Sequence, residues 1–360
     1  MTVTTHPPAR PFARTGVELA PIALGAMLMG TRTPEDQARR ILDDAVDSFA
    51  GGAPLMVDTA DCYCWWEDPD ADGGHSESVL GRWFADRPGV RDRLFLATKG
   101  TARVHDRDLL WGRRRADGTT VPEQDWPDAP DWDLARTRYV GAAASTLRES
   151  LEGSLRRLGV DTIDLYYVHV DDRSTPLEET LEQLAAFVHE GKVRHLGWSN
   201  VRTWRLERIR AICEREGWPQ PVAVQQQHSY LRRRAGLEHG SIVDDEQLDY
   251  LRERPDLQLV AYSPILKGVF DDPSKRGDHW AMGPYAGPDA DARFAAVDEV
   301  AAQLGVPGGQ VVLAWLLCRT APTVLPLVGP RTWEQYRSAV AAADVRLDDA
   351  QLALLDGAGA

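Results

Sequence analysis

Three apolar stretches of this chain each lead into a side chain that can hold or transfer a proton. They end at Asp58, with Tyr63 in the turn that follows, at Lys99 and at His169. The alkoxide formed when a carbonyl is reduced needs a proton, which a phenol can donate although its usual pKa is about 10. A nearby ammonium favours the phenolate and lowers that pKa, a carboxylate can tune the ammonium, and a histidine can orient the substrate oxygen. Together the four residues supply one group for each task.

Each residue alone also has a structural interpretation, because a strand-end Asp and Lys often form an ion pair and a tyrosine often packs in a core. The combination favours chemistry only if the strands end on one face, as they do in a closed parallel barrel. Strand patterns alternate with helical patterns along the chain, which predicts an α/β protein with a single (β/α)8 TIM barrel. We expect strands over 16–28, 54–57, 94–99, 163–169, 193–198, 222–225, 257–263 and 324–328.

Helical patterns fill the intervals between these strands. We expect helices over 33–49, 76–87, 147–158, 175–191, 202–216, 245–254, 291–304, 310–317, 333–343 and 348–355. We expect one unit over 1–360, with long active-site loops over 100–139 and 267–288 at the C-terminal face of the strands. A doubly wound dinucleotide-binding sheet is the rival fold, but the segment from Leu24 to Gly30 lacks the Gly-x-Gly-x-x-Gly spacing that it needs.

The bulk composition limits the partners. The 360 residues are 43% hydrophobic and 27% charged, with a formal net charge of -14, which disfavours nucleic acid and anionic membranes. Four cysteines are too few for a disulfide framework, and we expect no metal at Cys62 and Cys64. The N-terminus has no apolar signal core and no later run is long enough to span a bilayer, so a cytoplasmic location is expected. A small-molecule substrate remains, and the oligomeric state stays open.

Tryptophans surround the proposed proton donor. Trp65 and Trp66 follow Tyr63 directly, and the loop over 100–139 contains Trp111, Trp126 and Trp132. We interpret Trp65, Trp66 and Trp111 as walls of a substrate pocket, since flat aromatic faces suit a sugar ring or a polycyclic carbonyl compound. Packing of the loops onto the barrel is the alternative. His228 and Tyr230 are further candidates for the mouth of the barrel.

Several motifs, taken in order, resemble the aldo-keto reductase superfamily over nearly the whole chain. They are Asp58-Thr59-Ala60 with Tyr63, Glu77 with Leu80-Gly81, Thr98-Lys99, Ser154 to Gly159, Asp164-Leu165 with His169, Gly191 to Arg194, Gly197 to Asn200, Tyr262-Ser263-Pro264 and Gly329 to Thr332.

The resemblance implies a catalytic tetrad and a cofactor, NADP(H), bound across the barrel mouth without a Rossmann domain. Tyr63 would be the general acid, with Lys99 and Asp58 as its tuners and His169 orienting the carbonyl. The implied cofactor contacts are Ser199, Asn200 and Gln225 at the nicotinamide amide, Tyr262 at its ring, and Gly329, Arg331, Thr332 and Gln335 at the phosphate and adenine end. Ser263 and Pro264 are further implied cofactor contacts. Arg331 can grip a 2′-phosphate, whereas Ser199-Asn200 and Thr332 could simply cap helices.

The chain departs from the family pattern at three places. Ser338-Ala339 stands where the family usually has Asn, often after Glu, which leaves the preference for NADPH over NADH open. Cys64 stands where Gly is common, and the loop after Lys99 is longer than usual. Two other functions stay open: a metal-dependent barrel hydrolase or isomerase using Asp58, His75, Glu77 and His169, and a nucleotide-sensing barrel without catalysis.

Overall fold

Eight parallel strands form the centre of the molecule. The computed structural model describes residues 9–48, 52–277 and 279–359, and in this part of the chain the strands close into a barrel in the order β10-β3-β4-β5-β6-β7-β8-β9. The predicted (β/α)8 barrel is therefore confirmed. The strands are β3 (Ala23–Gly25), β4 (Leu55–Asp58), β5 (Leu94–Gly100), β6 (Ile163–Val168), β7 (Val193–Ser199), β8 (Pro221–Gln227), β9 (Gln258–Tyr262) and β10 (Val324–Val328).

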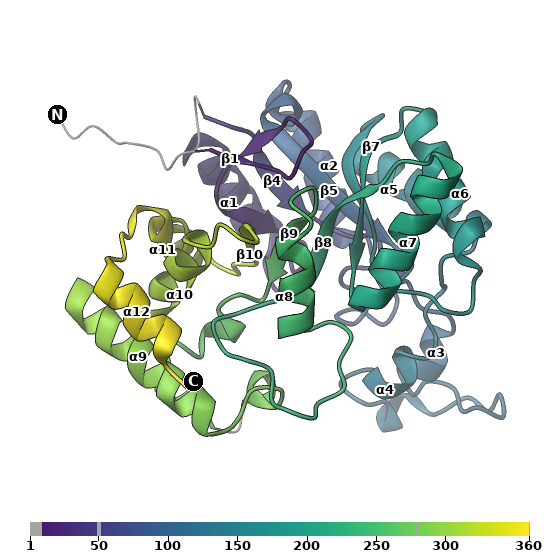
Figure 1. Ribbon diagram of the computed structural model, residues 1–360. Helices are drawn as coiled ribbons and strands as arrows, with labels where there is room; N and C mark the ends of the chain where they lie inside the picture. The colour runs from purple at the N-terminus through teal and green to yellow at the C-terminus, as the bar shows by residue number, and fades with distance from the viewer. Residues whose placement is uncertain (1–8, 49–51, 278, 360) are drawn as a thin grey trace.

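Helices surround this barrel (Figure 1). The longer ones are α1 (Glu35–Ser48), α2 (His75–Asp86), α5 (Ala144–Leu158), α6 (Leu177–His189), α7 (Thr203–Glu216), α8 (Asp245–Arg252), α9 (Pro288–Leu304), α10 (Gly308–Leu317), α11 (Trp333–Ala341) and α12 (Asp349–Gly357). Short 3-10 helices are η1 (Val90–Arg93), η2 (Glu123–Asp125), η3 (Leu266–Gly268), η4 (Pro273–Lys275), η5 (Trp280–Met282) and η6 (Ala342–Asp344). Left-handed glycines such as Gly159, with φ 66°, end several helices.

The expected opening strand over 16–28 is wrong in one respect. Its first half forms the short strand β2 (Glu18–Leu19), which pairs antiparallel with β1 (Arg10–Pro11), and only β3 joins the barrel. Pro21 lies between the two strands, where its missing N–H prevents a continuous ladder. The expected end of the first helix at Phe49 lies outside the described residues.

Two apolar layers hold the barrel together. Inside, alternate residues of the strands pack on one another, including Met56, Phe95 and Leu165. Phe12 of the β1–β2 hairpin packs on Phe95 with ring centroids 5.2 Å apart and fills the N-terminal end of the barrel. Outside, the other strand face packs against the helices. Because the N-terminal end is filled, the opposite end is left for a site, as is usual for this fold.

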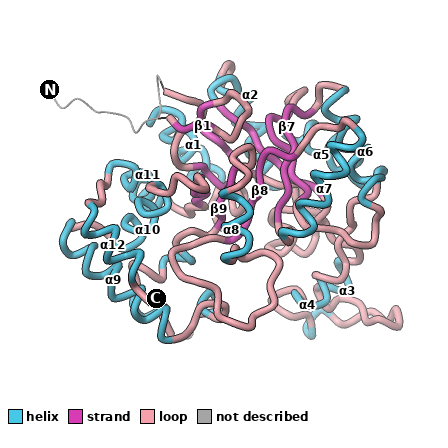
Figure 2. The backbone as a smooth tube through the Cα atoms, in the orientation of Figure 1, coloured by secondary structure: helices cyan, strands magenta, loops and turns pink. Residues whose placement is uncertain are grey.

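The segment over 100–139 is a long connection that contains two short helices, α3 (Arg107–Leu110) and α4 (Trp132–Ala135). Its two ends are joined by an isolated bridge between Val104 and Tyr139. Figure 2 shows the β1 hairpin and this segment at opposite ends of the barrel. The segment therefore lies toward the C-terminal ends of the strands.

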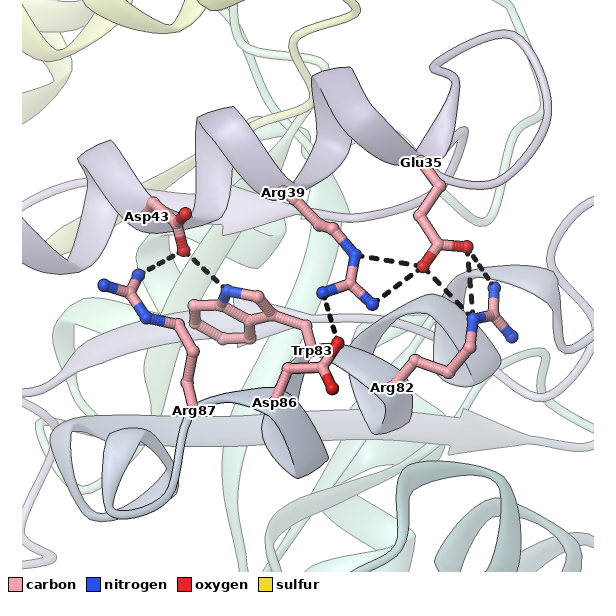
Figure 3. A network of polar contacts seen from close by, with 7 residues as sticks. All are labelled: Glu35, Arg39, Asp43, Arg82, Trp83, Asp86 and Arg87. Atoms are coloured by element: carbon pink, nitrogen blue, oxygen red, sulfur yellow. Dashed lines mark hydrogen bonds and ion pairs between the residues drawn. The ribbon is translucent and has the colours of Figure 1, made fainter.

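A network of charged side chains joins α1 to α2 (Figure 3). Glu35 accepts hydrogen bonds from Arg39 at 3.0 Å and from Arg82 at 2.5 Å, and these bonds lower its pKa to about 2. Asp43 accepts from the indole of Trp83 at 2.7 Å. The network also includes Asp86 and Arg87. It fixes α2, which follows the loop that carries Tyr63.

Among the described residues no single helix is long and apolar enough to cross a bilayer. Only α9 and α10 taken together reach that length and composition, and the two are bent by 98° relative to each other.

Candidate active site

The proposed catalytic residues continue the inward alternation of their strands. On β5 the side chains of Phe95, Ala97 and then Lys99 point into the barrel, and on β6 the same alternation leads from Leu165 through Tyr167 toward His169. Side chains on a strand alternate between faces with a period of two residues. The last inward position of each strand therefore lies at the C-terminal mouth.

The ammonium of Lys99 lies at the centre of the site. It donates to the phenol oxygen of Tyr63 at 2.8 Å, to the carbonyl of Thr59 at 2.8 Å and to the carboxylate of Asp58. Lys99 is 0% exposed, Asp58 1% and Tyr63 8%. The structure thus brings these three predicted residues into direct contact, and burial makes each hydrogen bond electrostatically stronger than it would be in water.

His169 lies on the other side of the phenol. Its ring centroid is 5.6 Å from that of Tyr63, with the planes at 79°. The backbone is held by its N–H to the carbonyl of Gly100 at 2.9 Å and by the amide of Asn200, which donates to the His169 carbonyl at 2.8 Å. Burial, followed by the charge of Lys99, lowers the pKa of His169 well below its usual value. The imidazole is therefore neutral at neutral pH.

The phenol of Tyr63 behaves differently from the sequence-based expectation. The charge of Lys99 was expected to lower its pKa, but burial and then the carboxylate of Asp58 raise the pKa well above its usual value. The desolvation of a buried phenolate outweighs the attraction of the ammonium. Tyr63 consequently keeps its proton at neutral pH, which is the form that a proton donor requires.

A chain of hydrogen bonds links the proposed nicotinamide contacts to Asp58. The amide of Gln225 donates to Asp58 at 2.8 Å, and the hydroxyl of Ser199 donates to the carbonyl of Gln225 at 2.8 Å. The amide of Asn200 donates to Ser199 at 3.1 Å, while the phenol of Tyr262 donates to the amide oxygen of Asn200 at 2.9 Å. These four side chains come from the ends of three neighbouring strands.

The turns that follow β7 and β9 carry backbone strain. Asn200 has φ 53° and Ser263 has φ 51°, values that residues with a side chain rarely adopt. The hydroxyl of Ser229 donates to the carbonyl of Pro264 at 2.6 Å and holds the second turn. Such strain persists only where the surroundings enforce it, and it concentrates at functional sites.

The segment from Gly329 to Gln335 begins helix α11. Thr332 is the N-cap, and its hydroxyl accepts from the backbone N–H of Gln335 at 3.2 Å. The side chain of Gln335 accepts from the backbone N–H of Arg331 at 2.8 Å. Thr332 therefore has the capping role that was one of its two interpretations. The side chain of Arg331 is exposed, and no ion pair with a described residue engages it.

Sequence reasoning missed Lys267, which is close enough to Arg331 for the two charges to interact. Burial and then the charge of Arg331 lower the pKa of Lys267, and no carboxylate of the described residues pairs with it. Two neighbouring cations without a counter-ion fit the phosphates of a dinucleotide. Lys267 follows Tyr262 by five residues, so its place just after the Tyr262-Ser263-Pro264 motif was the sequence signal that could have identified it.

Three tryptophans line one side of Tyr63. Trp66 lies edge-on to the Tyr63 ring at 6.2 Å, and Trp65 lies edge-on to Trp66 at 6.0 Å. Trp132 of α4 packs on Trp65 at 5.4 Å and on Trp66 at 5.8 Å. We call Trp65, Trp66 and Trp132 the tryptophan wall. Trp111, which was also expected to line the pocket, is 6% exposed, and no aromatic contact among the described residues involves it. Its part in the substrate pocket stays a prediction.

Two other residues have structural explanations. Cys64 has φ 79°, which is a reason for glycine to be common at this position, and its thiol donates to the carbonyl of Met27 at 3.1 Å. Tyr230 does not line the mouth as expected. It is 1% exposed, and its phenol donates to the carbonyl of Leu355 in α12 at 2.6 Å.

The two carboxylates of the ligand set proposed for a metal are engaged in other contacts. Asp58 pairs with Lys99, and Glu77 pairs with Arg157 at 2.7 Å while it accepts from Thr98 at 2.6 Å. Within residues 9–48, 52–277 and 279–359 no three His, Cys, Asp or Glu side chains gather in a way that could hold a metal ion.

A closed parallel barrel with a buried Tyr–Lys–Asp group at the C-terminal ends of its strands is the arrangement in which barrel enzymes keep their active sites. The model of the Aldo/keto reductase family matches residues 21–360. The chain belongs to this family, and it is accordingly an oxidoreductase.

Known proteins resemble the chain over almost its full length. It is 31% identical over 353 residues to the uncharacterized oxidoreductase YrpG of Bacillus subtilis, covering 96% of this chain and 94% of that protein. It is 28% identical to norsolorinic acid reductase stcV of Emericella nidulans, over 94% of this chain and 77% of that protein. Versiconal hemiacetal acetate reductase of Aspergillus parasiticus is 26% identical, with coverages of 95% and 94%.

A solved structure supports the fold. The thermostable aldo-keto reductase Tm1743, crystallised with the inhibitor epalrestat, aligns with a TM-score of 0.66 and 24% identity, over 97% of this chain and 98% of that chain.

Proposed function

We propose that this protein is an NADPH-dependent reductase that transfers hydride to an aldehyde or ketone, with Tyr63 as the general acid. The observation that carries the proposal is the buried contact between the Lys99 ammonium and the Tyr63 phenol at 2.8 Å, beside a neutral His169. Such a group can donate a proton to an oxygen that becomes negative during reduction.

The side chains of the mouth suit the cofactor. Ser199, Asn200 and Gln225 offer amide and hydroxyl groups for a carboxamide, and Tyr262 offers an aromatic face. Arg331 and Lys267 offer two positive charges that pair with no carboxylate of the described residues, and a Cβ at Gly329 would meet only the carbonyl of Gly25 at 3.9 Å, which leaves space for a ligand there. When bound, the reduced nicotinamide supplies the hydride.

The residues of the chain carry out the remaining tasks. The tetrad holds the substrate oxygen between the phenol of Tyr63 and the imidazole of His169, and both groups act as hydrogen-bond donors. As negative charge develops on that oxygen, Tyr63 releases its proton, and the adjacent Lys99 ammonium stabilises the resulting phenolate. Asp58 keeps the ammonium in place through the buried ion pair.

We propose a ring-containing substrate, which could be a sugar or another cyclic metabolite. The tryptophan wall offers flat apolar surface next to the proton donor, and aromatic faces bind planar groups by stacking. Two relatives are named as reductases of norsolorinic acid and of versiconal hemiacetal acetate, so reduction of small organic compounds occurs among the proteins that resemble this chain.

A cofactor-oxidation screen tests the proposal. The purified protein is mixed with NADPH or NADH and with panels of sugars, aliphatic aldehydes and aromatic ketones, while nucleotide absorbance is followed. Oxidation of NADPH that depends on a carbonyl compound supports the proposal. Tight nucleotide binding without turnover on any panel would instead favour the nucleotide-sensing barrel.

A further inference from the structure

The thiol of Cys62 contacts the imidazole ring of His169. Its sulfur lies 3.5 Å from Nδ1 of His169, within hydrogen-bond reach for a sulfur atom. The other ring nitrogen, Nε2, has no hydrogen-bond partner among the residues that the structure describes, and the His169 ring is partly exposed. One nitrogen is thus engaged by the protein and the other is available to a substrate.

Both partners of this contact are neutral. Burial and then the charge of Asp61 raise the pKa of the Cys62 thiol well above its usual value. Burial and Lys99 lower the pKa of His169 well below its usual value. The pair therefore shares two protons at neutral pH, one on sulfur and one on a ring nitrogen.

Only one arrangement of these protons leaves a donor facing the substrate. If the thiol donates to Nδ1, the ring proton resides on Nε2, where it can be donated to a carbonyl oxygen. If Nδ1 carries the proton, Nε2 presents a lone pair that repels that oxygen. An imidazole nitrogen is also a better acceptor than a thiol sulfur, which is only a weak acceptor. The hydrogen bond made by one nitrogen thus sets the role of the other.

The backbone of Cys62 is held in a fixed position. Gly73 has φ 94°, and a Cβ at this position would lie 2.7 Å from both the carbonyl carbon and the carbonyl oxygen of Cys62. The next glycine donates its N–H to the carbonyl of Tyr63 at 3.1 Å. The thiol is therefore placed by the same turn that places the proton donor.

We propose that Cys62 is a positioning residue that holds His169 in its Nε2–H tautomer, so that His169 donates a hydrogen bond to the substrate carbonyl. This inference rests on the proposed reduction of a carbonyl compound. It assigns a task to a residue that lies between two members of the tetrad in sequence and contacts a third in space.

Nitrogen NMR of the protein without substrate tests the tautomer directly. With ¹⁵N-labelled histidine at neutral pH, Nδ1 of His169 should be unprotonated and hydrogen-bonded in the natural protein. Cys62→Val removes the donor at similar volume and should produce a measurable Nδ1–H population, whereas Cys62→Ser should retain the Nε2–H form. A dominant Nδ1–H form in the natural protein, or equal tautomer populations in the natural protein and Cys62→Val, would overturn the proposal.

Kinetics give a second reading. Cys62→Val should lower kcat about five- to tenfold, as expected for one lost weak hydrogen bond, with KM for the nucleotide unchanged and activity restored in Cys62→Ser. Cys213→Val, the same change at a buried thiol in α7, is the matched control and should leave kcat unchanged. Equal kcat in Cys62→Val and the control counts against the role of Cys62. Absence of any carbonyl turnover counts against the proposed function. The tautomer assignment is tested separately, since the NMR result does not depend on turnover.

Discussion

The phenol oxygen of Tyr63 accepts a hydrogen bond from the ammonium of Lys99 at 2.8 Å, and both side chains are buried. The contact cannot ionise the phenol in the resting protein, because burial and Asp58 raise its pKa. It can stabilise the phenolate at the moment when the proton leaves. The same contact therefore leaves the phenol protonated in the resting protein and stabilises the phenolate during the reaction.

Tyr63→Phe should abolish reduction, because phenylalanine keeps the ring and removes the proton. We expect kcat to fall by at least about 10²-fold, with nucleotide binding, followed by fluorescence titration, nearly unchanged. Tyr230→Phe is the matched control, since that phenol is buried and donates to the carbonyl of Leu355 in α12. The control should lose about 1 kcal/mol of stability and keep its kcat. Full activity in Tyr63→Phe would refute its assignment as the general acid.

Arg331→Ala should weaken NADPH binding selectively. The guanidinium is exposed and has no ion-pair partner among the described residues, so its proposed partner is the 2′-phosphate. We expect KM for NADPH to rise about tenfold or more and KM for NADH to change little, since a charge-assisted hydrogen bond contributes about 1.5–3 kcal/mol. Arg337→Ala removes an arginine of α11, the helix that follows Arg331, and this arginine pairs with Asp44 at 3.5 Å, so the variant should affect neither nucleotide. Parallel rises for both nucleotides would contradict the assignment.

Trp132→Ala should affect ring-containing substrates only. Trp132 is 43% exposed and packs on Trp65 and Trp66, so its removal opens the tryptophan wall without emptying a core. We expect KM for ring-containing carbonyl compounds to rise about fivefold, in line with one aromatic contact, and KM for small aliphatic aldehydes to stay the same. Trp204→Ala in α7, where the ring is 50% exposed, serves as the control. An unchanged ratio of the two KM values would show that the tryptophan wall does not contact the substrate.

Asp61 should make the protein less stable as the pH rises. Burial, despite the hydrogen bond from Ser150, raises the pKa of Asp61 from 3.8 to about 7. The folded state therefore binds a proton more tightly than the unfolded state, and stability is lost between about pH 4 and about pH 7, by up to about 4 kcal/mol. Asp61→Asn should flatten the dependence of the free energy of unfolding on pH between pH 5 and pH 8, measured by urea titration.

Asp172→Asn is the contrasting variant for that experiment. Although burial opposes them, hydrogen bonds from Ser174 and Thr175 lower the pKa of Asp172 to about 2. Its contribution to stability is present above about pH 4 and is lost only as the pH falls toward 2. Between pH 5 and pH 8 Asp172→Asn should lower the free energy of unfolding by a constant amount. If the free energy of unfolding of the natural protein does not change with pH over this range, the Asp61 effect is excluded.

Gly73→Ala should disturb the site through the backbone. A methyl group there meets the carbonyl of Cys62 at 2.7 Å, and φ 94° is unfavourable for alanine. We expect a loss of about 3 kcal/mol from strain and overpacking together, with reduced kcat. Gly118→Ala has φ 89° and nothing within 4 Å of the added methyl group, so it should cost about 1 kcal/mol and leave kcat unchanged. The free energy of unfolding is measured for both variants by heat and by urea. Equal losses of stability in Gly73→Ala and Gly118→Ala would show that the contact with Cys62 is unimportant.

The barrel and the contact between Lys99, Tyr63 and Asp58 could be predicted from the sequence for a local reason. A period of two residues decides which side chains point inward, and parallel strands end on one face, so the last inward residue of each strand must lie at the mouth. Arg331 and Thr332 were predicted from a contiguous motif that resembles the family, without reference to the strands.

Features that depend on the folding of long connections could not be read in this way. The place of Trp132 beside Trp66 depends on how the 100–139 segment folds back on the mouth. The proximity of Lys267 to Arg331 joins two loops that are far apart in the chain.

The chain order of residues alone determined which groups reach the mouth of the barrel. Tertiary structure decided their protonation and their partners, because desolvation depends on everything packed around a group. The amino-acid sequence suggested a phenol with a lowered pKa at Tyr63, and burial reversed that direction. The contact of Cys62 with His169 likewise exists only because two strand ends of the closed barrel meet.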